Sequence, residues 1–296
     1  MGQLAELLPS RRELESLRRM LVRVAGEAAA YLRDRFGLDE LLVVVQRHHH
    51  DEDEGMRIDV ESERNILELL RAEGFRGLFL GEESGLVRLG SDPYVVVADP
   101  LDGSKNYAAL VPWSAVSVAL APVAGGSASL RDVVAGAVAP IFHWPVLSFA
   151  RGVGVYEGGA RVSREERGSR LVLAYVEKPE QARVVHRYLE LTGDKRSVRA
   201  LGSASLEIAW AGLGRAELFV DVRGRLRVVD VAAAAWLAAE AGSVVAVERP
   251  EASLLSVERI GSIAVSSPAA WPRLRRALED SGHRWADRLL ASGGGP

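Results

Sequence analysis

Three acidic segments, far apart in the chain, each follow an apolar run. LFL at 78–80 leads into GEESG at 81–85, and YVVVA at 94–98 leads into DPLDGS at 99–104. Asp230 follows a third apolar run and an arginine-rich turn, and it opens an alanine-rich segment. Buried strands that end at one edge of a sheet would bring these carboxylates together. The chain is therefore expected to fold so that these strand ends converge.

Apolar periodicity predicts the other elements. Apolar residues spaced by three and four predict helices over 11–36 and 59–70. Gly158-Gly159 predicts the turn of a hairpin within 146–162. Further strands are expected at 41–45 (or a helix end there), 113–123, 133–139, 171–176 and 216–222, and further helices at 179–192, 205–213 and 231–242. Because strands and helices alternate without a regular βαβ rhythm, we expect a layered α/β or α+β fold.

Two halves are expected to share one site. Residues 1–150 form an α+β half with most of the acidic residues, and residues 151–296 form an α/β half that supplies Asp230. No fixed-period repeat and no long linker separates them. We expect the break between the halves near 125–165.

Composition excludes several kinds of site and partner. The chain has no cysteine, which excludes disulfides, thiolate nucleophiles and cysteine-bound metals. A formal net charge of -3 offers no electrostatic footprint for nucleic acid. The charged N-terminus lacks the apolar core of a signal peptide, and no run is long enough to cross a membrane. A cytoplasmic protein with neither nucleic acid nor membrane as a partner is therefore expected.

The acidic segments favour a metal site. Carboxylates that lie close together are costly unless cations neutralise them, and oxygen-only ligands suit Mg²⁺. Two such ions can activate a water and stabilise the leaving oxygen of a phosphoryl group. After the second segment, Gly103, Ser104 and Lys105 open a turn or helix whose free N–H groups can bind an anion. Taken singly, each segment fits a solvated loop, a turn or a helix cap, but their order and spacing together favour catalysis.

The motifs resemble a known family. GEES at 81–84, DPLDGS at 99–104, and Asp230 with eleven residues between it and Gly242 resemble the metal-binding signature of the inositol monophosphatase superfamily. The resemblance is closer to the archaeal branch, whose members hydrolyse both inositol monophosphate and fructose 1,6-bisphosphate, and it extends to about residue 275. It implies a layered αβαβα sandwich of the sugar-phosphatase type, a homodimer, and two or three Mg²⁺ ions per site.

The resemblance also implies a ligand set. The ligands would be Glu82, Asp99 and the Leu101 carbonyl for the first Mg²⁺, and Asp99, Asp102 and Asp230 for the second. A third metal would take an acidic residue from the loop at 51–54, where Asp53 is the best match and Asp51 and Glu52 are alternatives. Glu82 is also counted among the catalytic residues.

Water and phosphate would be handled by neighbouring residues. The resemblance implies that Ser104, paired with Asp59, orients the attacking water, and that the N–H groups of Gly103 and Ser104 hold the phosphate. Glu63, one helical turn after Asp59, is an alternative to it or else a residue on a solvated helix face. Glu83 matches a supporting residue of the family rather than a ligand.

The sequence departs from the family pattern at three positions. Val229 stands where the family has tryptophan before its last aspartate, and Ser243 replaces the second glycine of the closing pair. Ser104 replaces threonine, as it does in the archaeal branch. The ligand set is intact despite these changes.

Substrate choice is assigned to an arginine-rich segment. Arg223, Arg225 and Arg227 precede Asp230, and guanidinium groups bind phosphate in a bidentate manner. Arg223 stands where the inositol-specific branch has a glutamate. We expect Arg223 or Arg225 to meet a second phosphate and favour fructose 1,6-bisphosphate, the alternative being that they are surface charges. Ser203 and Ser205 are expected to line the sugar pocket.

The resulting hypothesis is a phosphate-monoester hydrolase. It would act on fructose 1,6-bisphosphate, inositol 1-phosphate or both, by metal-activated water and without a covalent enzyme intermediate. Two alternatives remain. One is a nucleotide phosphatase acting on 3′-phosphoadenosine 5′-phosphate or NADP, and the other is a non-catalytic regulator associated with RNA polymerase.

Overall fold

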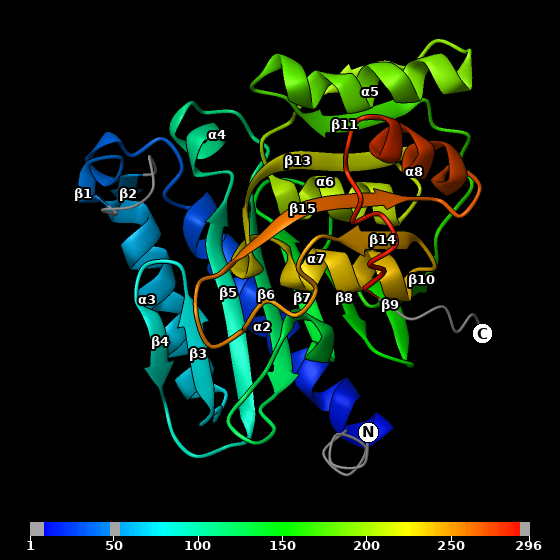
Figure 1. Ribbon diagram of the computed structural model, residues 1–296. Helices are drawn as coiled ribbons and strands as arrows, with labels where there is room; N and C mark the ends of the chain where they lie inside the picture. Colours follow the sequence, from blue (N-terminus) through cyan, green and yellow to red (C-terminus); the bar gives the residue numbers. More distant parts are fainter. Residues whose placement is uncertain (1–8, 48–53, 291–296) are drawn as a thin grey trace.

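The structure is a computed structural model that describes residues 9–47 and 54–290. Two large sheets alternate with three layers of helices (Figure 1). This arrangement confirms the predicted αβαβα sandwich. Three hydrophobic clusters fill the spaces between successive layers.

The larger sheet contains eight strands: β3 (Leu78–Gly81), β4 (Gly85–Arg88), β5 (Tyr94–Asp102), β6 (Ala115–Pro122), β7 (Ala135–Pro140), β8 (Leu147–Ala150), β9 (Gly154–Glu157) and β10 (Ala160–Val162). Their order is β10-β9-β8-β7-β6-β5-β3-β4. β3 and β5 are parallel, and the other neighbours are antiparallel. Every residue of β6 and β7 is buried, because helices cover both faces of the sheet.

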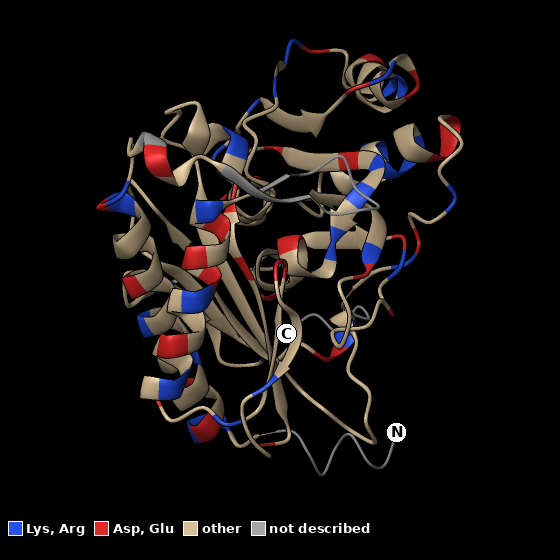
Figure 2. Ribbon diagram, turned by 90° about the vertical axis from the view of Figure 1, so that its left-hand side faces the viewer, with Lys and Arg blue, Asp and Glu red and all other residues tan. Residues whose placement is uncertain are grey.

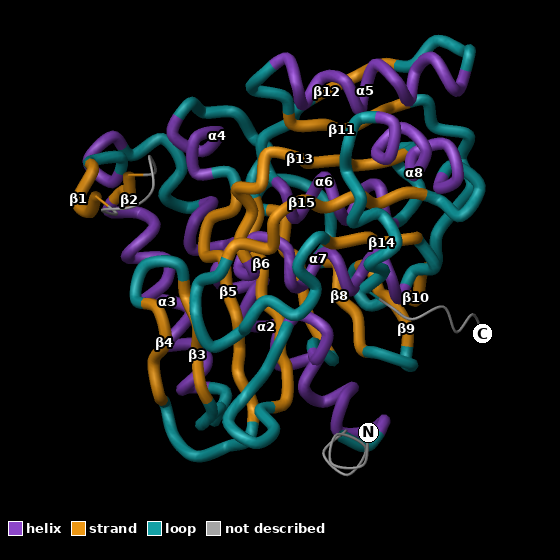
Figure 3. The backbone as a smooth tube through the Cα atoms, in the orientation of Figure 1, coloured by secondary structure: helices purple, strands orange, loops and turns teal. Residues whose placement is uncertain are grey.

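The smaller sheet contains five strands: β11 (Leu171–Tyr175), β12 (Ser197–Arg199), β13 (Leu218–Arg227), β14 (Val244–Val247) and β15 (Arg259–Ser266). Their order is β12-β11-β13-β15-β14, in which β11 is parallel to β12 and β13 while β15 is antiparallel to its neighbours (Figure 3). A separate pair, β1 (Val44–Arg47) and β2 (Glu54–Met56), precedes the larger sheet.

Helices form the remaining layers. The larger sheet packs against α2 (Arg11–Arg33) and α3 (Arg57–Ala72) on its outer face, and α6 (Ala204–Gly212) and α7 (Val228–Glu240) lie between the sheets. α5 (Pro179–Thr192) and α8 (Trp271–Asp280) pack on the smaller sheet. Short elements are α4 (Ser104–Ala108), η1 (Asp39–Leu41) and η2 (Leu130–Asp132).

The position of each helix follows from its sequence pattern. α2 buries one face and, like α3, exposes charged residues of both signs on the other (Figure 2). α7 is apolar on all sides, and its residues 228–238 are buried between the two sheets. Within the described ranges, no helix is both long and apolar enough to cross a bilayer.

Most of the predicted elements are confirmed, and one prediction is wrong. The segment before Asp230 is not a turn, because β13 continues to Arg227 and α7 begins at Val228. At 41–45, the strand begins only at Val44. The sequence patterns did not identify β2, β4, β12, β14, β15 or α8. The strands change from one large sheet to the other between residues 162 and 171.

Candidate active site

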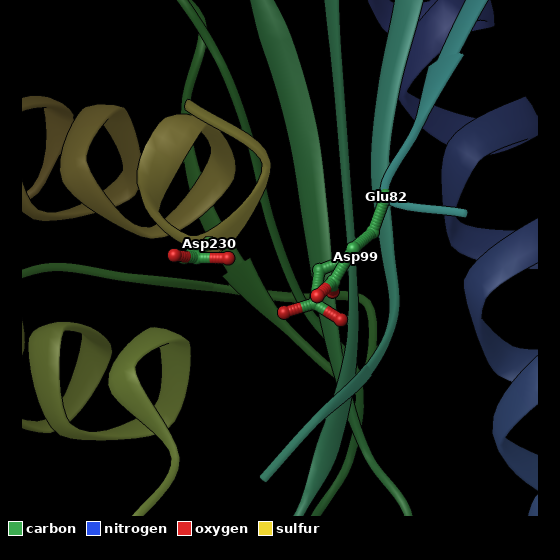
Figure 4. A group of neighbouring side chains, drawn as sticks. All are labelled: Glu82, Asp99 and Asp230. Atoms are coloured by element: carbon green, nitrogen blue, oxygen red, sulfur yellow. The ribbon is translucent and has the colours of Figure 1, made fainter. Parts of the chain in front are cut away.

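Neighbouring strands bring Glu82 and Asp99 together. β3 and β5 run parallel with Gly81 opposite Ala98, so the residues that follow lie at the same edge of the sheet. Glu82 comes from the turn after β3, and Asp99 belongs to β5. Figure 4 shows the two side chains meeting at this edge.

Asp230 reaches the same place from the layer between the sheets. It is the third residue of α7, and its carboxylate accepts the backbone N–H of Arg227 at 2.7 Å, which caps the helix. Glu82, Asp99 and Asp230 each offer a carboxylate oxygen, and these oxygens lie within 4.8 Å of one another (Figure 4). The fold thus joins all three acidic segments, as the sequence predicted.

Arg227 lies against this carboxylate cluster. Its Nη2 donates to Glu82 Oε1 at 2.5 Å and is 3.6 Å from Asp230 Oδ1. Burial alone would lower the pKa of Arg227, but the charges of Asp230 and Glu82 outweigh it and raise that pKa. The guanidinium therefore stays charged beside the carboxylates.

Asp99 is a buried acid of the cluster whose pKa is perturbed. Burial raises its pKa well above the usual range, and the negative charges of Glu82 and Asp102 raise it further. Its Oδ1 accepts the backbone N–H of Leu101 at 3.0 Å, which fixes the orientation of the carboxyl group.

The donor set fits a hard divalent cation. A raised aspartate pKa measures how costly it is to ionise neighbouring carboxylates in a buried site, and a bound cation would remove that cost. Glu82, Asp99 and Asp230 offer only oxygen atoms, which Mg²⁺ prefers. The residues present therefore fit the predicted metal.

Asp102 points in another direction. Its carboxylate accepts the hydroxyls of Ser203 and Ser205 and the N–H groups of Ala204 (3.0 Å) and Ser205 (2.8 Å), so it caps the start of α6. Burial raises its pKa to about 6, although these hydrogen bonds act in the opposite direction. Its predicted role as a ligand stays a prediction.

A bulge in β5 separates the two aspartates. Asp99 pairs with Ser117 but Asp102 with Ala115, so one extra residue is accommodated between them. Leu101, whose carbonyl was predicted as a ligand, lies in this bulge. Gly103 follows with a φ of 88° and is the N-cap of the short helix α4.

Asp59 and Glu63 are both buried at the start of α3. Asp59 accepts the N–H of Met56 at 2.8 Å, and burial raises its pKa to about 7. It shares no hydrogen bond with Ser104 among the described residues. Glu63 is not on a solvated face: it accepts the N–H groups of Glu83 and Ser84, each at 2.8 Å, and so holds the turn that presents Glu82.

The predicted substrate residues are already engaged. Arg223 binds Asp221 in a bidentate manner and also pairs with Glu177 at 2.7 Å. Arg225 is about half exposed and lies 3.4 Å from Glu177. Ser203 is fully buried, so a contact with substrate would require its hydrogen bond to Asp102 to open. Asp53, with Asp51 and Glu52, lies outside the described residues.

Glu207 was missed by the sequence reading. This fully buried acid of α6 accepts the N–H groups of Leu201 and Gly202, each at 3.0 Å, and the hydroxyl of Tyr175. Burial raises its pKa to about 7. It fixes the loop that leads to Ser203. An acidic residue in an otherwise apolar helical run, LEIAWAG, was the available signal.

Comparison with known proteins identifies relatives that cover most of the chain. A sequence model of the inositol monophosphatase family matches residues 13–282. An inositol-1-monophosphatase from Aeropyrum pernix is 36% identical over 269 residues, covering 88% of this chain and 97% of that protein. A fructose-1,6-bisphosphatase/inositol-1-monophosphatase from Thermococcus kodakarensis is 32% identical, covering 68% of this chain and 74% of that protein.

Solved structures share the fold. The extragenic suppressor protein suhB from Bartonella henselae superimposes with a TM-score of 0.72 at 24% identity, covering 89% of this chain and 98% of that chain. At that identity the similarity concerns the fold alone.

Proposed function

The chain belongs to the inositol monophosphatase family and is a phosphatase. From this premise we propose that it hydrolyses inositol 1-phosphate and fructose 1,6-bisphosphate and requires Mg²⁺ for this reaction. The observation that carries the proposal is the convergence of Glu82, Asp99 and Asp230 within 4.8 Å. The names of the Aeropyrum and Thermococcus relatives support the two substrates.

The carboxylates would hold the metal. Glu82, Asp99 and Asp230 would bind Mg²⁺, with Asp102 and the Leu101 carbonyl as the further ligands expected from the family pattern. Bound there, Mg²⁺ would polarise the phosphoryl oxygens and lower the pKa of a water.

Other residues of the chain would bind the phosphate and move the proton. The N–H groups of Gly103 and Ser104, and the positive end of the α7 dipole at Asp230, would attract the phosphate. Asp59, whose pKa is raised to about 7, can exchange a proton near neutral pH. These roles support hydrolysis by water rather than by a side-chain nucleophile.

Phosphate release with and without Mg²⁺ tests the proposal. We expect release from both substrates by the wild type, none in EDTA, and a loss on the order of 100-fold or more in Asp99→Asn. Asp34→Asn, at an exposed aspartate that ends α2, is the matched control and should remain active. Release that persists in EDTA, or no release from either substrate, would contradict the proposal.

We further propose that Arg225 contacts the second phosphate of fructose 1,6-bisphosphate. It is more exposed than Arg223, whose side chain is bound by Asp221. Arg225→Ala should raise the KM for the bisphosphate about tenfold and leave that for inositol 1-phosphate unchanged. Arg223→Ala should instead lower stability, because it leaves Asp221 buried without its guanidinium. Equal KM changes for both substrates would refute the assignment.

We also propose a homodimer. Leu110, Val111 and Trp144 are exposed by 56%, 43% and 48%. Trp144 packs edge-on against Trp113, which lies in the same loop as Leu110 and Val111. Apolar groups exposed together are typical of an interface. Light scattering should give a dimer that Leu110→Asp dissociates. The matched control is Leu86→Asp, at an exposed leucine of β4; a wild-type monomer would contradict the proposal.

A further inference from the structure

A cavity of about 310 Å³ lies at the edge of the smaller sheet where β11, β12 and β13 begin and β15 ends. Separate segments contribute five arginines to its wall. They are Arg164, Arg167 and Arg170 before β11, Arg196 before β12, and Arg273 in the first turn of α8.

Two of these arginines are held by the fold, and a third, Arg167, pairs with Glu165 at 2.6 Å. Arg164 donates to the carbonyl of Gly212 and the hydroxyl of Ser243, and it pairs with Glu166. Arg196 binds Glu217 through Nε at 2.8 Å and Nη2 at 3.2 Å. The wall has three acids, of which Glu166 pairs with Arg164, Glu217 pairs with Arg196, and Asp194 lies 3.6 Å from Arg196.

Three donor groups remain available to a ligand. Nη1 of Arg196 is buried and makes no hydrogen bond, and it forms only a longer ion pair, at 3.6 Å, with the exposed Asp194. The side chains of Arg170 and Arg273 are exposed and have no hydrogen bond or ion pair within the described part of the chain. A buried donor without a hydrogen bond is costly, and an anion in the cavity would supply one.

We propose that this cavity is a binding site for a small anion that carries at least two phosphate groups. Guanidinium groups match the geometry of phosphate oxygens, and three of them from separate segments can surround such an anion. The volume is at the lower end for small-molecule sites. No aromatic side chain lines the cavity, so it offers no surface on which a nucleobase could stack. The class of ligand is therefore an oligophosphate or a sugar bisphosphate.

The site is separate from the carboxylate cluster. Arg164 binds Ser243, just beyond the end of α7, whereas Asp230 is in its first turn. The 13 residues of α7 span about 20 Å, so the two sites lie at opposite ends of this helix. Binding in the cavity consequently does not depend on the proposed phosphatase activity.

Titration calorimetry with pyrophosphate, at constant ionic strength and in EDTA, tests the site. EDTA removes the divalent ions through which the carboxylate cluster would bind a phosphate. We expect one saturable site in the wild type and affinity at least tenfold weaker in the Arg170→Ala/Arg273→Ala double variant. Both side chains are exposed and lack partners, so the variant should fold.

Arg71→Ala is the matched control, because Arg71 is an exposed arginine on α3, away from the cavity. It should bind pyrophosphate as the wild type does. Absence of saturable binding, or equal affinity in the double variant and the wild type, would overturn the proposal. Loss of binding in Arg71→Ala would also overturn it, because general charge and not the cavity would then be responsible.

Discussion

At the residue scale, the carboxylate cluster contains its own counter-ion. Arg227 lies 145 residues from Glu82 in the chain, yet its guanidinium donates to that carboxylate at 2.5 Å. It also lies next to Asp230, which caps its backbone N–H. In this arrangement one positive charge offsets part of the repulsion among the carboxylates that Mg²⁺ is proposed to neutralise.

Arg227→Gln should therefore destabilise the protein most when metal is absent. Loss of a charged hydrogen bond in a partly buried site costs about 2 kcal/mol. We expect the Tm of Arg227→Gln to be lower than that of the wild type in EDTA. In Mg²⁺ the difference in Tm should be smaller, because the metal would neutralise the same carboxylates. Thermal unfolding in the two conditions provides the measurement.

Arg71→Gln is the control for that measurement and should change neither Tm. If Arg227→Gln lowered the Tm equally in EDTA and in Mg²⁺, the arginine would serve packing rather than charge compensation.

Sequence patterns identified the carboxylates but not all of their partners. Glu82, Asp99 and Asp230 each follow an apolar run, which is a local pattern. Glu63 was assigned either to catalysis or to a solvated helix face, and the solvated face is wrong, because its buried carboxylate accepts the N–H groups of a turn about 20 residues away. Nothing in a helical pattern reveals such a partner.

At the scale of elements, the connection from β5 to α4 depends on a glycine. Gly103 has a φ of 88°, and a Cβ there would meet the carbonyl oxygen of Gly202 at 3.0 Å and that of Trp113 at 3.1 Å. The turn therefore requires both a left-handed backbone and close approach of two other segments. It follows the bulge that separates Asp99 from Asp102.

Gly103→Ala should lower the free energy of unfolding by about 1–3 kcal/mol, the range for left-handed strain in a constrained site. Gly125→Ala is the matched comparison, because Gly125 also has positive φ (57°) but has no atom within 4 Å of a Cβ. Denaturant unfolding should show a larger loss for Gly103→Ala. Equal losses would mean that the contacts with Gly202 and Trp113 contribute nothing.

For the whole molecule, folding buries several acids at the junction of the layers. Burial raises the pKa of Asp59 and of Glu207 to about 7, and that of Asp102 to about 6, from ordinary values of 3.8 to 4.5. At a pH between the ordinary and the raised pKa values, the folded protein binds more protons than the unfolded chain. The stabilisation from protonation is therefore complete below about pH 4 and is lost as the pH rises through 6 to 7.

The metal-free protein should accordingly become less stable as the pH rises from 5 to 8. Thermal unfolding in EDTA across this range measures the effect. Glu207→Gln should weaken the pH dependence, because the amide keeps the shape of the side chain but does not titrate. A Tm that rises with pH in EDTA would contradict this expectation.

The sequence by itself determined the alternation of helices and strands, the family, and the three acidic segments, because these depend on local periodicity and on motifs within a few residues. Only the tertiary structure decided which groups meet. It directs Asp102 to the start of α6, brings Arg227 to Glu82, and gathers Arg170, Arg196 and Arg273 around one cavity. Such contacts join segments whose separation along the chain leaves no periodic signal, since they are set by how the sheets and helices pack.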